Sequence, residues 1–141
     1  ALLTDPEETA MLLVTLAEEM PTSEAIDLYR AARDELRIAV ERVVINQLYP
    51  NDFGRQPELG EALEALVAQG AHRRRDPLRC MLASAETIRR RQAINATYLE
   101  RLDTAIPRPQ LRLPHLFAPQ LDREALEPLV NAFSAVLEEY S

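Results

Sequence analysis

The stretch Val43-Val44-Ile45-Asn46-Gln47-Leu48-Tyr49-Pro50 decides the fold class of this chain. Its apolar, β-branched start runs into an amide pair and then a proline. Such a run predicts a short, buried strand that ends at a polar edge. In open α/β sheets, ligands bind beyond the carboxyl ends of the strands. Asn46 is therefore either a ligand-binding side chain, able to hydrogen-bond an adenine ring, or a residue that caps a turn.

A second buried strand is predicted upstream, over Met11 to Leu16. It is followed by Glu18 and Glu19, which we interpret as loop and helix-cap acids. Thr22 and Ser23 predict a helix start with a hydroxyl cap. The apolar face expected of this helix consists of Ala25, Leu28, Ala32 and Leu36. The helix leads into the strand at Val43, so the unit predicts a right-handed parallel βαβ crossover.

Downstream, the pattern predicts three helices and a third strand. The expected segments are a helix from Pro57 to Gly70, a long helix from Pro77 to Ala105, a strand from Gln110 to Leu113, and a last helix capped by Asp122. The last helix is expected to start near Glu127, because Pro128 would cost about 3 kcal/mol inside a regular helix. The fold class predicted is α/β, with a three-layer arrangement of parallel strands and flanking helices plus a helical segment.

Several segments, taken in order, resemble one known family. They are Thr15-Leu16-Ala17-Glu18-Glu19-Met20-Pro21, Glu24-Ala25-Ile26, Val44-Ile45-Asn46-Gln47, Arg89 to Leu102, Leu111 to Phe117, and Leu121 to Tyr140. This series resembles the C-terminal part of the ArsA-type ATPases, which include arsenite-pump ATPases and the targeting ATPase of the Get pathway. The resemblance covers most of residues 5–140 and is weakest between 51 and 86.

The resemblance implies that residues 1–141 are the C-terminal portion of a P-loop ATPase, with a helical insert at about 51–91. The P-loop itself is absent, because the chain has no lysine and its three glycines are scattered. In the family, the matching asparagine contacts the adenine edge and the loop after the last strand lies beside the base. The implied adenine site consists of Asn46, Gln47, Pro114, His115 and Leu116.

The resemblance also implies cofactors and partners. ATP and Mg²⁺ would bind the intact parent, with phosphates and metal held by the absent segments. We expect neither tight cofactor binding nor ATP hydrolysis by this chain alone, and we assign it no catalytic residue. The implied partners are the missing P-loop portion, a second copy in a homodimer, and a protein or oxyanion client.

The composition argues against several classes of function and binding site. The net charge of −7 argues against non-specific binding to nucleic acid. No apolar run approaches the roughly 20 residues of a membrane span. The single cysteine, Cys80, suits a cytoplasmic protein and is interpreted as a small core residue. With His72 and His115 it forms no zinc motif, so we predict no metal site, and the homodimer that the resemblance implies would form without metal.

Two arginine runs and the helical segment leave alternatives open. His72 to Arg75 and Arg89 to Arg91 look like nucleic-acid patches, but the acidic total and the lack of interleaved aromatic residues favour solvated helix surfaces. A third possibility is contact with phosphates or with a partner subunit. In the helical segment, Leu59, Leu63, Leu66, Met81 and Leu82 predict apolar faces that pack on each other or on a partner. The alternative function is therefore a stand-alone α/β interaction module that binds no nucleotide.

Overall fold

The computed structural model describes Asp5 and residues 7–49, 61–62, 65, 68 and 77–137. The chain divides into two compact units, one formed by Ala1–Leu48 with Asn95–Ser141 and the other by Tyr49–Ile94. The predicted helix from Pro57 to Gly70 is described only at 61–62, 65 and 68, which are helical. The turn at Asn51 and the run His72 to Arg75 lie outside the described residues, and the insert at about 51–91 stays a prediction.

The first unit is built on an open sheet of three parallel strands. These are β1 (Met11–Leu16), β2 (Val40–Leu48) and β3 (Gln110–Pro114), in the order β1-β2-β3. Val44 at the centre pairs with Val14 on one side and Leu111 on the other. The prediction of parallel strands in an α/β fold is confirmed. β2 begins earlier than expected because Val40 is buried and pairs with Met11.

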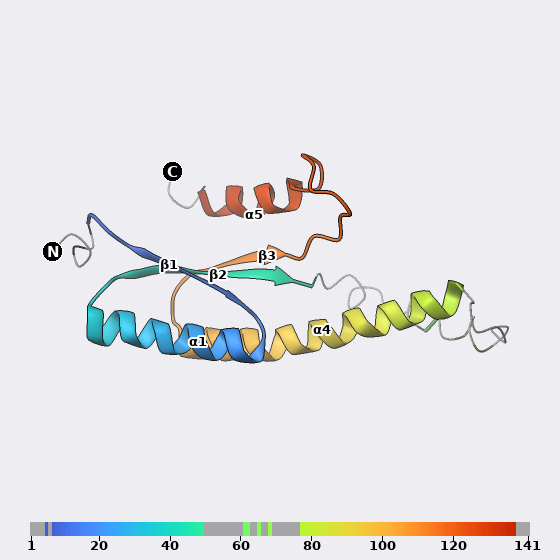
Figure 1. Ribbon diagram of the computed structural model, residues 1–141, viewed down its shortest axis with the longest axis horizontal. Coiled ribbons are helices and arrows are strands. Elements are labelled where there is room, and N and C mark those ends of the chain that lie inside the picture. The colour runs from blue at the N-terminus through green and yellow to red at the C-terminus, as the bar shows by residue number, and fades with distance from the viewer. Residues whose placement is uncertain are drawn as a thin grey trace. The chain divides into compact units, whose positions relative to one another are not determined.

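Helices cover both faces of this sheet (Figure 1). One face packs against α1 (Glu19–Arg30) and the last turns of α4 (Pro77–Ala105). The core on this side contains Leu13, Ala17, Ala25, Ile26, Tyr29, Ala32, Val40, Val43, Ile45, Leu102 and Ile106. The other face carries a smaller core of Val44, Leu111 and Leu113 beneath α5 (Glu127–Leu137). Since both faces are covered, the middle of β2, Val43 to Ile45, is continuously apolar.

The start of α1 differs from the prediction. The helix begins at Glu19, with Glu18 in the N-cap position, so the hydroxyl cap expected at Thr22 and Ser23 is wrong. Pro21 lies in the first helical turn, where a missing N–H costs no intrahelical bond, and it does not delay the helix. Glu18 lies before the helix and Glu19 in its first turn, as the interpretation of loop and helix-cap acids places them, but the Glu18 side chain makes no cap hydrogen bond.

The buried face of α1 also differs from the prediction. Leu28 and Leu36 are exposed, whereas Ile26 and Tyr29 are buried with Ala25 and Ala32. The two candidate faces share alanines, so helical spacing alone does not choose between them. A π-helical turn, η2 (Ala31–Leu36), follows α1 and ends at Arg37, whose backbone is left-handed with φ 55°.

The bounds predicted for α4 and the start predicted for α5 are confirmed, whereas Asp122 caps the turn before α5 and not the helix itself. α4 runs from Pro77 to Ala105 and α5 begins at Glu127, after a turn in which the Asp122 carboxylate accepts a hydrogen bond from the Ala125 N–H at 2.9 Å. Cys80, however, is exposed, and its interpretation as a core residue is wrong. It lies five residues before the buried Ala85, about 140° around the helix from it.

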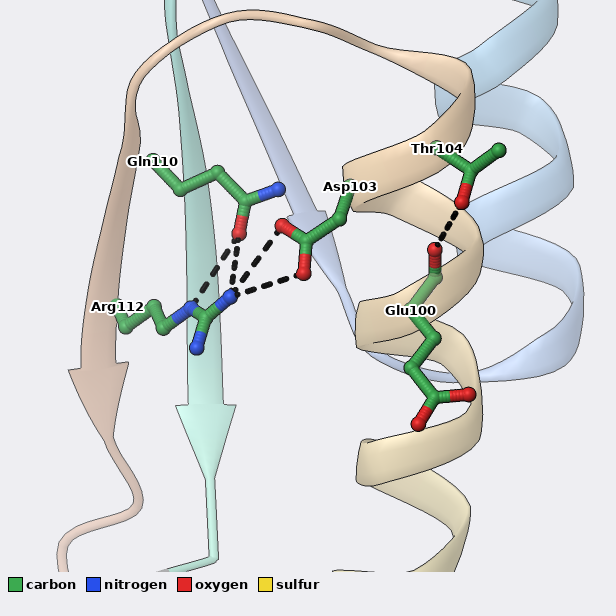
Figure 2. A network of polar contacts seen from close by, with 5 residues as sticks. All are labelled: Glu100, Asp103, Thr104, Gln110 and Arg112. Carbon is green, nitrogen blue, oxygen red and sulfur yellow. Dashed lines mark hydrogen bonds and ion pairs between the residues drawn. The ribbon is translucent and has the colours of Figure 1, made fainter.

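The two edges of the sheet have opposite character. At the β3 edge, Arg112 reaches the Asp103 carboxylate of α4 at 3.3 Å and the Gln110 amide oxygen at 3.1 Å (Figure 2). At the β1 edge, Leu12 and Val14 are 60% and 66% exposed. Charged residues protect an edge strand from further pairing, and exposed apolar residues do not. The β1 edge is therefore the one suited to continue the sheet.

Candidate functional site

The carboxyl ends of β2 and β3 bring the predicted site residues together. Leu48 pairs with Pro114, and the backbone N–H of His115 donates to the Leu48 carbonyl at 2.8 Å. The strand-end cluster, defined as Asn46, Gln47, Pro114, His115 and Leu116, therefore gathers at one edge of the sheet. Gln47 is exposed and the other four residues are half-buried, so the cluster faces accessible surface.

A backbone irregularity shapes the β2 side of the cluster. The register of β2 against β3 shifts between Ile45 and Leu48, and Gln47 has a left-handed backbone with φ 57°. The Asn46 side-chain oxygen accepts a hydrogen bond from the Gln47 N–H at 2.8 Å. Asn46 thus supports the local bulge, as the turn-cap interpretation requires. Its side-chain NH₂ group is the part that can donate to an acceptor nitrogen of a base.

His115 lies against an aromatic neighbour that the sequence interpretation did not include. The His115 and Phe117 rings meet edge to face, with centroids 4.6 Å apart. Phe117 is exposed, so its ring extends an apolar surface beside the cluster. An exposed aromatic ring next to amide groups suits a heteroaromatic base, which stacks on the ring and hydrogen-bonds to the amides.

The end of β1 is fixed by buried hydrogen bonds. The Asn95 side-chain NH₂ of α4 donates to the Ala17 carbonyl at 3.0 Å, and both residues are buried. The Thr15 hydroxyl donates to the Pro21 carbonyl at 3.0 Å, and the Thr22 hydroxyl to the Leu16 carbonyl at 3.3 Å. These bonds satisfy backbone groups that a strand end would otherwise leave unpaired. They hold the turn from β1 into α1.

Sequence reasoning missed the role of Asn95, although a signal was present. Asn95 lies seven residues before Leu102 on α4 and so shares its buried face. A polar residue on an apolar helical face predicts a buried hydrogen bond, because an unpaired amide there is costly.

A groove of about 350 Å³ lies on the β1 side of Asn46. Its lining comes from β1, from Pro21, Glu24, Ala25 and Leu28 of α1, and from Asn46 of β2. Asn46 therefore stands between this apolar groove and the β3 end of the strand-end cluster.

The described residues contain no group of three or more histidine, cysteine, aspartate or glutamate side chains placed to hold a metal ion. None of the described helices combines the length and apolar character that a membrane span requires. No protein-family model matches the chain, and a search of the curated proteins found no similar sequence.

Proposed function

We propose that this chain is the C-terminal portion of an ArsA-like ATPase and supplies the adenine side of its nucleotide pocket. The observation that carries the proposal is the meeting of two parallel strand ends, one with the Asn46-Gln47 amide pair and one with Pro114 and His115. Ligands of open parallel sheets bind at such an edge. Asn46 would donate to the base, and the loop from Pro114 to Leu116 would lie along its plane.

The unprotected edge of β1 supports the same proposal. The exposed side chains of Leu12 and Val14 belong to the face that α5 covers farther along the sheet. A further parallel strand beside β1, with its own helix, would bury both. The P-loop portion would occupy this place, and would bring the groups for the phosphates and Mg²⁺ that this chain lacks. The parent would be a cytoplasmic homodimer acting on an oxyanion or a protein client.

Asn46→Ala in the intact parent tests the proposal. We expect nucleotide binding to weaken by about 1–3 kcal/mol, because one hydrogen-bonding group of the base is left unpaired. Discrimination between ATP and GTP should fall as well. Isothermal titration calorimetry measures both effects, and Asn131→Ala, an exposed change on α5, is the matched control. Unchanged affinity and base preference in Asn46→Ala would leave Asn46 with only its turn-cap role.

The alternative function, an interaction module without nucleotide, is favoured by one observation. Val130, Phe133 and Leu137 form an exposed apolar stripe along α5. A stripe at this spacing is typical of a helix that packs on another protein. The gene sequence upstream of Ala1 separates the two functions, since a glycine-rich, lysine-bearing loop after a strand supports the ATPase and a nearby start codon supports the module.

A further inference from the structure

The amino ends of the strands form a second cavity, at the edge of the sheet away from the strand-end cluster. It encloses about 280 Å³ and is lined by Tyr29, the backbone segment Ile38–Val40, and three arginines, Arg33, Arg37 and Arg108. The arginines come from three separate segments: η2, the turn before β2, and the loop before β3. The sequence separation of Arg108 from the other two means that the fold, and not a local charge run, brings them together.

The charges around this cavity do not cancel. Arg33 forms a two-fold hydrogen-bonded pair with Asp34, at 2.6 and 2.9 Å, and lies over the Tyr29 ring at 5.4 Å. The Arg33 guanidinium lowers the pKa of the Asp34 carboxyl, so that pair is fully ionised and neutral overall. Within the described part of the chain, Arg37 and Arg108 make no ion pair. Two positive charges therefore remain in a chain whose net charge is −7.

The backbone of Arg37 gives an independent reason to assign the cavity a role. Arg37 follows the π-helical turn in a left-handed conformation, with φ 55° and ψ 37°. Glycine is the usual residue at such a helix end, because a side chain there is strained. Strained residues and π-turns concentrate at functional sites. An arginine at this position points to a use for its side chain.

Compensation of the helix dipole accounts for only part of this arrangement. Basic side chains are favourable near a helix C-terminus, which explains a single arginine after η2. However, the Ala32 carbonyl at this helix end already accepts hydrogen bonds from the N–H groups of Arg37 and Ile38. Arg108 belongs to another segment, the loop before β3, and also lines the cavity.

We propose that this arginine cavity binds a phosphate-type oxyanion between Arg37 and Arg108, beside the Arg33–Asp34 pair. Guanidinium groups bind phosphate through paired, charge-assisted hydrogen bonds, and two of them suit a doubly charged tetrahedral anion better than a singly charged carboxylate. The site is independent of the proposed nucleotide pocket, which lies at the carboxyl ends of the strands.

Titration of the 141-residue chain with inorganic phosphate, followed by NMR of the arginine Nε–H groups and backbone amides, tests this site. A chloride series at equal ionic strength controls for screening. We expect saturable shifts at Arg37, Ile38 and Arg108 with phosphate and not with chloride. Equal responses to phosphate and chloride, or shifts spread evenly over all exposed arginines, would overturn the proposal.

Two variants and one control test whether Arg37 and Arg108 bind the anion. Arg37→Gly removes a cavity charge and suits the left-handed backbone, so we expect an unchanged or higher melting temperature together with binding weakened about tenfold or more. Arg108→Gln should weaken binding to a similar degree, and Arg123→Gln, an exposed change in the turn before α5, should not. Full phosphate affinity in both Arg37→Gly and Arg108→Gln would overturn the site.

A parallel titration with glycerol 3-phosphate distinguishes the source of the anion. Tighter binding than inorganic phosphate would support the site and indicate a phosphate ester as its ligand. Equal binding would also support the site and indicate the free ion. Acetate bound more tightly than phosphate would contradict the assignment to a tetrahedral oxyanion.

Discussion

Asn46 and Asn95 carry the same side chain and serve different purposes. Asn95 is buried and holds the Ala17 carbonyl across the interior of its unit, at 3.0 Å. Asn46 is half-buried, and its carbonyl oxygen serves only the next residue along β2. A residue whose bond spans two elements contributes to stability, whereas one at an accessible strand end leaves its donor group at the surface, where the proposed nucleotide would meet it.

Asn95→Ala is expected to lower the free energy of unfolding by about 1–3 kcal/mol, because the buried Ala17 carbonyl loses its partner. Urea denaturation of the 141-residue chain measures this change. The matched control is Asn131→Ala on the exposed side of α5, where a change within about 0.5 kcal/mol is expected. Equal effects of the two substitutions would show that the Asn95 bond adds nothing to stability.

At the scale of elements, α1 shows what sequence patterns can and cannot predict. The strand at Met11–Leu16, the long helix Pro77–Ala105 and the helix start at Glu127 follow from apolar runs bounded by proline, which are local signals. The face of α1 depends on tertiary packing, and Ile26 and Tyr29 are buried in place of the predicted Leu28 and Leu36. Likewise, parallel pairing of β2 and β3 predicts that the strand-end residues lie together. The arginine cavity was not predictable, because Arg108 is distant in sequence from Arg33 and Arg37 and only the fold brings them together.

Ile26→Ala and Leu28→Ala compare the observed and the predicted face of α1 directly. Ile26 is 5% exposed and Leu28 is 48% exposed. We expect Ile26→Ala to cost about 2–5 kcal/mol of stability through the cavity it leaves, and Leu28→Ala to cost under about 1 kcal/mol. Chemical denaturation of both variants measures the difference. The reverse order would mean that α1 is rotated and that the sequence-predicted face is the buried one.

At the scale of the whole molecule, the sheet has one edge strand protected by charged side chains, β3, and one that is not, β1. Arg112 and its partners protect β3, while β1 presents Leu12 and Val14 without a cover among the described residues. The α5 stripe of Val130, Phe133 and Leu137 adds further exposed apolar surface. Surfaces of this kind are stable in water when another chain segment or protein buries them. Both functional hypotheses require that another segment or protein buries these apolar surfaces. In the ATPase hypothesis the P-loop portion of the parent protein does so, and in the interaction-module hypothesis a separate partner protein does.

Val14→Lys separates the two hypotheses because only a parent protein whose sheet continues past β1 would bury the new lysine. In the isolated chain, a lysine on the β1 edge should raise the monomer fraction measured by light scattering, since charge on an edge strand opposes pairing. In an intact ATPase whose sheet continues past β1, the same lysine would be buried without a partner and should lower the melting temperature by several degrees.

Leu36→Lys, an exposed apolar-to-lysine change on η2, is the control and should affect neither sample strongly. A parent protein that tolerates Val14→Lys as well as Leu36→Lys would have no strand beside β1, and the C-terminal-portion proposal would fail while the interaction module remained.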